Sequence, residues 1–197
     1  MSRQVLERII ALLRARQISF ELFEHEPVRT SEEAAFMRAQ RSGLSPEEHL
    51  KRGAKAMVLR SEGMENCTCQ VAQLVQFADS EMRLNHDTNC AFRYKFIQVV
   101  ISAAKKVDLA KVKKLLNTDS LSLASPIEVE NAIDCVPGSV PPFGSLFNIP
   151  VYVDKSLLSN EFMDFSAGEK TVSIEMKVKD WQALVKPVVC DVACREG

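Results

Sequence analysis

Residues 53–60 read Gly53-Ala54-Lys55-Ala56-Met57-Val58-Leu59-Arg60. After the glycine the stretch is mostly apolar, which is typical of a buried β-strand entered from a loop. Because side chains alternate along a strand, Lys55 shares a face with Met57 and Leu59. A charge among apolar side chains is hard to bury without a partner. Taken alone, however, a lysine that extends from a strand edge to water is the commoner explanation.

Helix signals lie on both sides of this strand. Residues 5–13 carry an apolar stripe at helical spacing, with Glu7 and Arg8 away from it. Other helices are predicted from cap residues, some with a glutamate three positions later or a proline at the first helical position. These start signals are Thr30 with Glu33, Ser45-Pro46 with Glu48, Asp108, Ser125-Pro126 with Glu128, and Asp180.

Strand signals alternate with the helices but not regularly. Period-two or continuous apolar runs predict strands near residues 18–23, 55–60, 94–101, 149–153 and 172–178. Some of these runs stand alone between helices, and others read as antiparallel neighbours. This mixture predicts an α+β, or mixed α/β, domain built on one sheet rather than a doubly wound parallel fold.

Length and composition favour one domain in a reducing compartment. The chain has 197 residues, which fits a single domain over 1–197 with an insertion. The polar segment 61–92 reads as that insertion, with one short strand or helix near 71–77. A net charge of −1 gives no overall basic field, so a nucleic-acid binder must gather its positive charge locally. No apolar run is long enough to span a membrane, and six scattered cysteines favour a cytoplasmic location.

The common catalytic and metal-binding motifs are absent from the sequence. It has no nucleophile elbow and no phosphate-binding glycine loop. Its three histidines, His25, His49 and His86, do not combine with Cys67-x-Cys69 or with Cys190 and Cys194 into a zinc pattern. We therefore expect free thiols, no metal and no cofactor.

A second unusual stretch lies far downstream of Lys55. Residues 136–144 read Val136-Pro137-Gly138-Ser139-Val140-Pro141-Pro142-Phe143-Gly144, which must form a loop. Rigid Pro/Gly turns are common, so the loop alone does not indicate a function.

Together, the lysine strand and this loop resemble the YbaK family, the free-standing relatives of the bacterial prolyl-tRNA synthetase editing domain. The resemblance covers nearly the whole chain in order. It implies a mixed, barrel-like curled sheet surrounded by helices. The supporting stretches are His25-Glu26-Pro27, Thr30-Ser31-Glu32-Glu33-Ala34, residues 123–129, Val151-Tyr152-Val153-Asp154, and Ser166-Ala167-Gly168.

The resemblance implies a trans-acting aminoacyl-tRNA deacylase. In that family the loop, here Gly138 to Pro142, cups the aminoacyl ester with backbone groups, and the lysine, here Lys55, holds the terminal adenosine or its phosphate. An ester is already activated, so its hydrolysis needs positioning and oriented N–H groups more than a strong nucleophile. The resemblance also implies that the ribose hydroxyl of the substrate positions water. The expected substrate is a small mischarged amino acid, alanine or cysteine, on tRNA-Pro.

The resemblance also implies the partners. We expect the acceptor end of an aminoacyl-tRNA and an aminoacyl-tRNA synthetase, and we expect no membrane. A catalytically silent tRNA- or synthetase-binding module is the alternative, since Val140 and the double proline alter the loop. A local cluster of basic residues from Arg93 to Lys114 is the best candidate for tRNA phosphates, although a solvated helix face would look the same. The expected residues are Lys55, Gly138 and Ser139 for catalysis; His25, Thr30, Val140, Pro142, Phe143, Gly144, Ala167 and Gly168 for substrate binding; and Lys105, Lys106, Lys111, Lys113 and Lys114 for tRNA.

Overall fold

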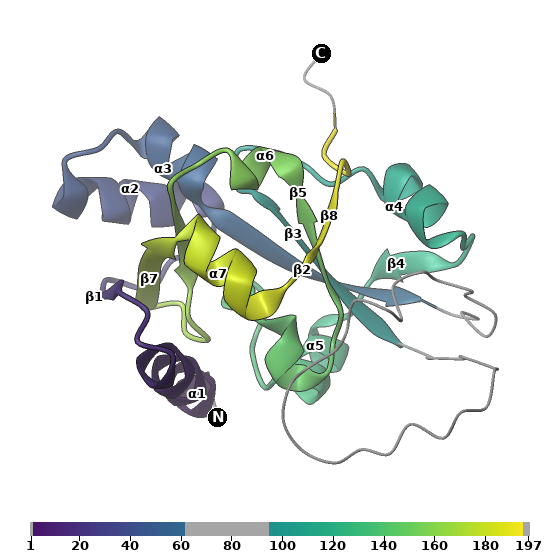
Figure 1. Ribbon diagram of the computed structural model, residues 1–197, viewed down its shortest axis with the longest axis horizontal. Coiled ribbons are helices and arrows are strands. Elements are labelled where there is room, and N and C mark those ends of the chain that lie inside the picture. The colour runs from purple at the N-terminus through teal and green to yellow at the C-terminus, as the bar shows by residue number, and fades with distance from the viewer. Residues whose placement is uncertain (1, 62–94, 195–197) are drawn as a thin grey trace.

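The computed structural model describes residues 2–61 and 95–194 (Figure 1). Apart from Ser61, the predicted insertion at 61–92, with its short element near 71–77, lies outside the described residues. So do His86, Cys67, Cys69 and Arg93.

Helices and strands alternate along the described residues much as the cap signals and apolar runs predict. The helices are α1 Ser2–Ala15, α2 Ser31–Ser42, α3 Pro46–Arg52, α4 Leu109–Leu116, α5 Pro126–Ile133, α6 Lys155–Leu158 and α7 Val178–Val185, with a 3₁₀ helix at Gly144–Phe147. The strands are β1 Phe20–Glu24, β2 Ala54–Ser61, β3 Phe96–Ser102, β4 Leu121–Leu123, β5 Val151–Asp154, β6 Phe162–Ser166, β7 Val172–Lys177 and β8 Val188–Cys190.

The described strands form two sheets, where a single curled one was expected. One sheet has the order β1-β7-β6 and is antiparallel throughout; the other has the order β4-β2-β3-β5-β8 and mixes both directions. A bridge between Gly53 and Asp164 links the two. The α+β prediction is confirmed.

Both faces of the five-stranded sheet are buried. On one face Val58, Val100 and Val153 join a large core with the three-stranded sheet, α1, α5 and α7. On the other face Leu59 and Ile101 pack with α4. Figure 1 shows the β2–β3 ladder crossing the middle of the molecule, with α2 and α3 toward one end and α4 with β4 toward the other. Strands covered on both faces explain the nearly continuous apolar runs in the sequence.

Some local predictions were wrong. Helix α7 begins at Val178 with Lys177 as its cap, so Asp180 lies in the first turn instead of capping it. Thr30 accepts from the N–H of Glu33, but the Glu33 carboxylate accepts from Arg29 instead of returning to Thr30, so only half of the capping box forms. On α4, Val112 and Leu116 are buried, whereas the apolar side chain of Leu115 is 43% exposed.

The pairing of β2 leaves one of its edges partly uncovered. Strand β3 pairs with β2 from Ala54 to Arg60, whereas β4 pairs only with Leu59 to Ser61. Residues 54–58 therefore present an edge that β4 does not cover. Such an edge carries unpaired backbone groups and invites another segment or a ligand.

Candidate functional site

A pocket of about 550 Å³ lies along this uncovered edge of β2. Its volume falls in the range of about 300–1,000 Å³ that small-molecule sites occupy. Most of its lining comes from four segments, and Ala103 and Ser166 complete it. The segments are residues 28–38 around the start of α2, residues 53–58, residues 123–129 at the start of α5, and the loop residues Pro137, Gly138 and Val140. Of the predicted site residues, the pocket brings together Lys55, Thr30, Gly138 and Val140.

Lys55 keeps most of its hydrogen-bonding capacity. Its half-buried ammonium donates one hydrogen bond, to the carbonyl of Lys105 at 2.6 Å. An ammonium has three N–H donors, and Lys55 makes no other bond within the described part of the chain. Burial lowers the pKa of Lys55, the charge of Lys106 lowers it further, and Glu32 opposes both. The side chain is thus a cation held at the pocket with two donors to spare.

The first half of the loop is a turn held by hydrogen bonds between its own residues. Gly138 has a φ of +91°, a left-handed conformation that glycine adopts without strain. The backbone N–H and the hydroxyl of Ser139 both donate to the carbonyl of Val136, at 3.1 and 2.9 Å. The N–H groups of Gly138 and Val140 donate to no acceptor among the residues described. Two backbone donors beside the pocket therefore remain available, while the Ser139 hydroxyl is occupied.

The second half of the loop is anchored to the core. The side-chain amide of Gln98 donates to the carbonyl of Pro141 at 2.9 Å and accepts from the N–H of Gly144 at 2.8 Å. The Trp181 indole donates to the carbonyl of Pro142 at 2.8 Å. These contacts hold Pro142 and Gly144 against the core, away from the pocket.

Phe143 and Gly144 complete this anchor. Phe143 is fully buried and meets Phe165 edge-on, with ring centroids 5.4 Å apart. A side chain at Gly144 would place its Cβ 2.9 Å from the carbonyl of Ile149, so glycine is required there. Gln98 was not among the residues that the sequence predicted to shape the site. A glutamine within an apolar strand was the signal that could have revealed it.

The remaining predicted binding residues support the pocket from outside. His25 bonds the Glu26 carbonyl through Nδ1 at 2.8 Å and the Ser173 hydroxyl through Nε2 at 2.9 Å. Buried Ala167 donates its N–H to Val172, and the N–H of Gly168 donates to the carbonyl of Ser139. Gly168 thereby braces the loop, and it lines a separate hollow of about 450 Å³.

The predicted tRNA-binding lysines divide into two groups. Lys105 and Lys106 lie beside Lys55, as the hydrogen bond and the pKa effect above show. Lys111 is already engaged, since its ammonium donates to the carbonyl of Ala193 at 2.7 Å and pairs with Asp191 at 3.4 Å. Lys113 and Lys114 occupy the last turn of α4 and do not line the pocket.

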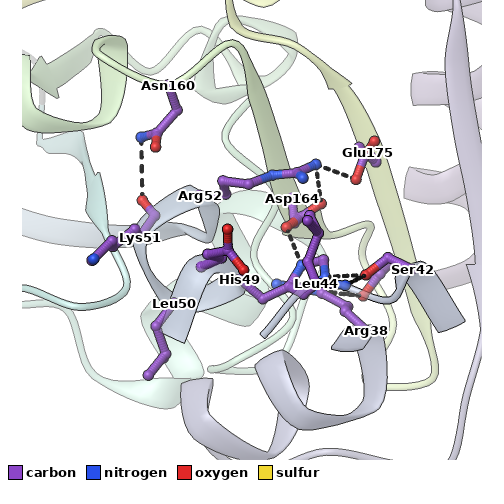
Figure 2. A network of polar contacts seen from close by, with 12 residues as sticks. Arg38, Ser42, Leu44, His49, Leu50, Lys51, Arg52, Asn160, Asp164 and Glu175 are labelled. Carbon is purple, nitrogen blue, oxygen red and sulfur yellow. Dashed lines mark hydrogen bonds and ion pairs between the residues drawn. The ribbon is translucent and has the colours of Figure 1, made fainter. Parts of the chain in front are cut away.

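A buried polar network lies between α2, α3 and the three-stranded sheet (Figure 2). His49, on the largely polar helix α3, is 1% exposed. Its Nδ1 bonds Asp164 Oδ2 at 2.7 Å, and its Nε2 bonds the Ser42 hydroxyl at 2.6 Å. Arg52 bridges Asp164 and Glu175. Burial favours the neutral form of Asp164, but the His49 hydrogen bond and the charges of Arg38 and Arg52 outweigh it and lower the pKa of that carboxyl.

Arg38 connects this network to the pocket. Its side chain lines the pocket although the residue is only 5% exposed. Its Nε and Nη2 donate to the Ser173 hydroxyl at 3.2 and 3.1 Å. Burial lowers the pKa of the guanidinium, an effect that Asp164 opposes.

Comparisons with known proteins point to one family. Residues 87–184 match the family model described as the aminoacyl-tRNA editing domain. The chain is 24% identical over 182 residues to the multifunctional Ser/Thr-tRNA deacylase ProXp-y of Escherichia coli (strain K12), covering 92% of this chain and 88% of that protein. The same protein from Escherichia coli O157:H7 matches equally.

Solved structures share the fold. A candidate trans-editing enzyme for prolyl tRNA synthetase superposes with a TM-score of 0.67 at 21% identity, over 98% of each chain. A scaffold protein used for computational grafting of linear epitopes gives a TM-score of 0.68 at 20% identity, also over 98% of each chain.

Proposed function

Because the chain belongs to the YbaK-type aminoacyl-tRNA editing domain family, we propose that it is a trans-acting deacylase that hydrolyses the ester of a mischarged small amino acid on tRNA. The observation that carries this proposal is that Lys55, Gly138 and Val140 line one pocket. These parts come from distant positions in the sequence. They supply the two things that ester hydrolysis needs most, a hold on the substrate and donors for the oxyanion.

The proposed chemistry uses backbone groups and water. Water attacks the ester carbonyl, and the N–H groups of Gly138 and Val140 stabilise the developing oxyanion. Lys55 holds a phosphate or hydroxyl of the terminal adenosine with its two remaining donors. The Ser139 hydroxyl is bonded to Val136, which supports a reaction without a side-chain nucleophile. The ribose hydroxyl of the substrate is then the group that orients the water.

The choice of amino acid is the finer part of the proposal. The sequence resemblance implies alanine or cysteine on tRNA-Pro, whereas the relative in Escherichia coli is named a Ser/Thr-tRNA deacylase. Pocket size distinguishes these only weakly, because one methylene changes binding by about 1–3 kcal/mol. A polar group in the pocket must therefore decide between them.

The direct test is a panel of tRNAs charged with alanine, cysteine, serine or threonine, incubated with the purified full chain. We expect deacylation of at least one member well above the spontaneous rate. Release of none of the four would refute the deacylase. Binding of charged tRNA without turnover would instead support the silent binding module.

Lys55 offers a second test. The change Lys55→Ala should lower kcat/KM by about a hundredfold, since it removes a positioning charge from the substrate. Its half-buried position at a strand end predicts an unchanged thermal midpoint. Lys55→Arg is the matched control that keeps the charge and should recover part of the activity. Normal turnover by the alanine variant would remove Lys55 from the mechanism.

A further inference from the structure

The pocket has one polar wall and one apolar wall. Strands β6 and β7 pair Ser166 with Ser173 and Asp164 with Glu175, and alternation along each strand places these four side chains on one face. Arg38 lies against this face through its bonds to Ser173, and Arg38 and Ser166 both line the pocket. Apolar side chains, among them Val58, Val129 and Val140, line another part of the pocket.

The guanidinium of Arg38 keeps a free donor in this wall. Its Nε and Nη2 share the hydroxyl of Ser173, but its Nη1 makes no hydrogen bond to any residue that the structure describes. This nitrogen lies near Gly53, since a Cβ built on that residue would lie 3.6 Å from Nη1. Among the described residues, Nη1 of Arg38 is not one of the buried atoms that lack a partner. It is therefore open to solvent and can donate a hydrogen bond to an oxygen that enters the pocket.

The hydroxyl of Ser166 is the second group without a partner. It makes no hydrogen bond to another residue within the described ranges, and it lies next to Ser173 in the cross-strand register. A hydroxyl both donates and accepts. An incoming alcohol oxygen can therefore accept from Arg38 while its own proton is donated to Ser166.

We propose that Arg38, assisted by Ser166, determines specificity by hydrogen-bonding an oxygen on the side chain of the aminoacyl group, so that serine and threonine are preferred to alanine and cysteine. Alanine has no such atom, and a cysteine thiol is a weak acceptor. Acidic side chains are disfavoured because the negative charge of Asp164 already acts on the guanidinium. The inference rests on the proposed deacylase function and names the substrate class of the same pocket.

The kinetic test compares kcat/KM for Ser-tRNA and Ala-tRNA, which differ by one oxygen. In the wild-type protein the serine substrate should be favoured at least tenfold, and Arg38→Met should remove about that factor from the ratio, as expected for one charge-assisted hydrogen bond. Ser166→Ala should lower the ratio by a smaller factor. Arg41→Met is the matched control, because Arg41 is an exposed arginine on the same helix that stacks on Phe23 outside the pocket. The Arg41→Met protein should show the same ratio of kcat/KM for Ser-tRNA to kcat/KM for Ala-tRNA as the wild type.

A binding test separates this inference from the deacylase itself. Non-hydrolysable 3′-seryl-amido and 3′-alanyl-amido adenosine are titrated calorimetrically into the wild-type and Arg38→Met proteins. A preference for the seryl compound that the variant loses supports the role of Arg38, even if the protein proved unable to turn over any charged tRNA. Equal affinity of the wild type for both compounds, a preference for an aspartyl analogue, or a seryl preference that survives in the variant would overturn it.

Folding of the variant is controlled separately. Arg38 is buried in a charged network, so Arg38→Met could lower the thermal midpoint. Arg38→Lys keeps the charge but cannot reach both Ser173 and the substrate, so it should fold and still lose most of the serine preference. If Arg38→Met does not fold, the ratios for Arg38→Lys and Ser166→Ala decide. Wild-type ratios in both would refute the proposal.

Discussion

Gln98 fixes the shape of the loop at residues 136–144 through two atoms of one side chain. It is fully buried, and its amide satisfies the Pro141 carbonyl and the Gly144 N–H together. Gln98→Leu keeps a similar size but leaves both backbone groups unpaired, which should lower the free energy of unfolding by about 2–5 kcal/mol. Urea denaturation measures this loss, and kcat should fall with it because the oxyanion donors lose their orientation.

Gln98→Glu is the matched variant. It retains the acceptor for the Gly144 N–H but places a carboxylate against the Pro141 carbonyl. This variant should therefore also be less stable than the wild type, and the pKa of the introduced carboxyl group should be raised. A leucine variant with an unchanged urea midpoint would show that the loop is held without Gln98.

Sequence could identify the residues whose chemistry is local. Lys55 and Gly138 stood out because a lysine in an apolar strand and a glycine between prolines are visible without partners. Arg38, His49 and Gln98 did not, because their meaning depends on atoms such as those of Asp164 and Pro141 that lie far away in sequence. The binding roles expected for Lys55 and the loop remain predictions, although the pocket brings Lys55, Gly138 and Val140 together.

At the scale of elements, Asp154 ties the end of the chain to the central sheet. Its Oδ2 accepts from the N–H groups of Val192 and Ala193 at 2.7 and 2.8 Å, and its Oδ1 caps α6 at Ser156. Burial by itself would raise the pKa of this carboxyl, but the hydrogen bonds from Ser156, Val192 and Ala193 outweigh it and lower the pKa. Ionised Asp154 therefore stabilises the position of β8.

The lowered pKa of Asp154 predicts that the protein loses stability in acid. A carboxyl whose pKa is lowered by folding stabilises the protein above its unfolded pKa of about 3.9, and that contribution is lost as the pH falls through the lower folded value. The urea midpoint should be flat near neutrality and fall below about pH 4. Asp154→Asn should be less stable at pH 7, and the gap between variant and wild type should narrow toward pH 3. A gap that stays constant over this range would mean that the charge of Asp154 does not hold β8.

Element boundaries followed the strength of local signals. Ser45, Asp108 and Ser125 were correctly placed as caps, because cap and proline chemistry acts within four residues. Strands β4 and β8, each three residues long, carried too little pattern to recognise. They exist because β2 and β5 offer edges for pairing.

At the scale of the whole molecule, the division into two sheets creates the pocket. Local patterns predicted five of the eight described strands and missed β4, β6 and β8. They could not show which strand pairs with which, since register and pairing depend on contacts between distant segments. The junction places Gly53 beside Asp164 and leaves the β2 edge open between the sheets. The order of motifs along the chain was visible in the sequence. The polar wall with Arg38 was not, because it forms only when α2 packs against β6 and β7.

The charge distribution predicts how tRNA approaches this opening. The net charge of −1 gives no general attraction, so Lys106, whose charge acts on Lys55, should bind a phosphate near the acceptor end. Removing one lysine–phosphate interaction lowers the slope of log KM against log salt by about 0.7–0.9. We therefore expect Lys106→Gln to reduce that slope by this amount at salt concentrations around the physiological value, with kcat little changed. Lys114→Gln, at the far turn of α4, is the matched control and should leave the slope unaltered. If the two variants lower the slope equally, the lysines attract tRNA through their summed charge, and the prediction that Lys106 binds a phosphate near the pocket is wrong.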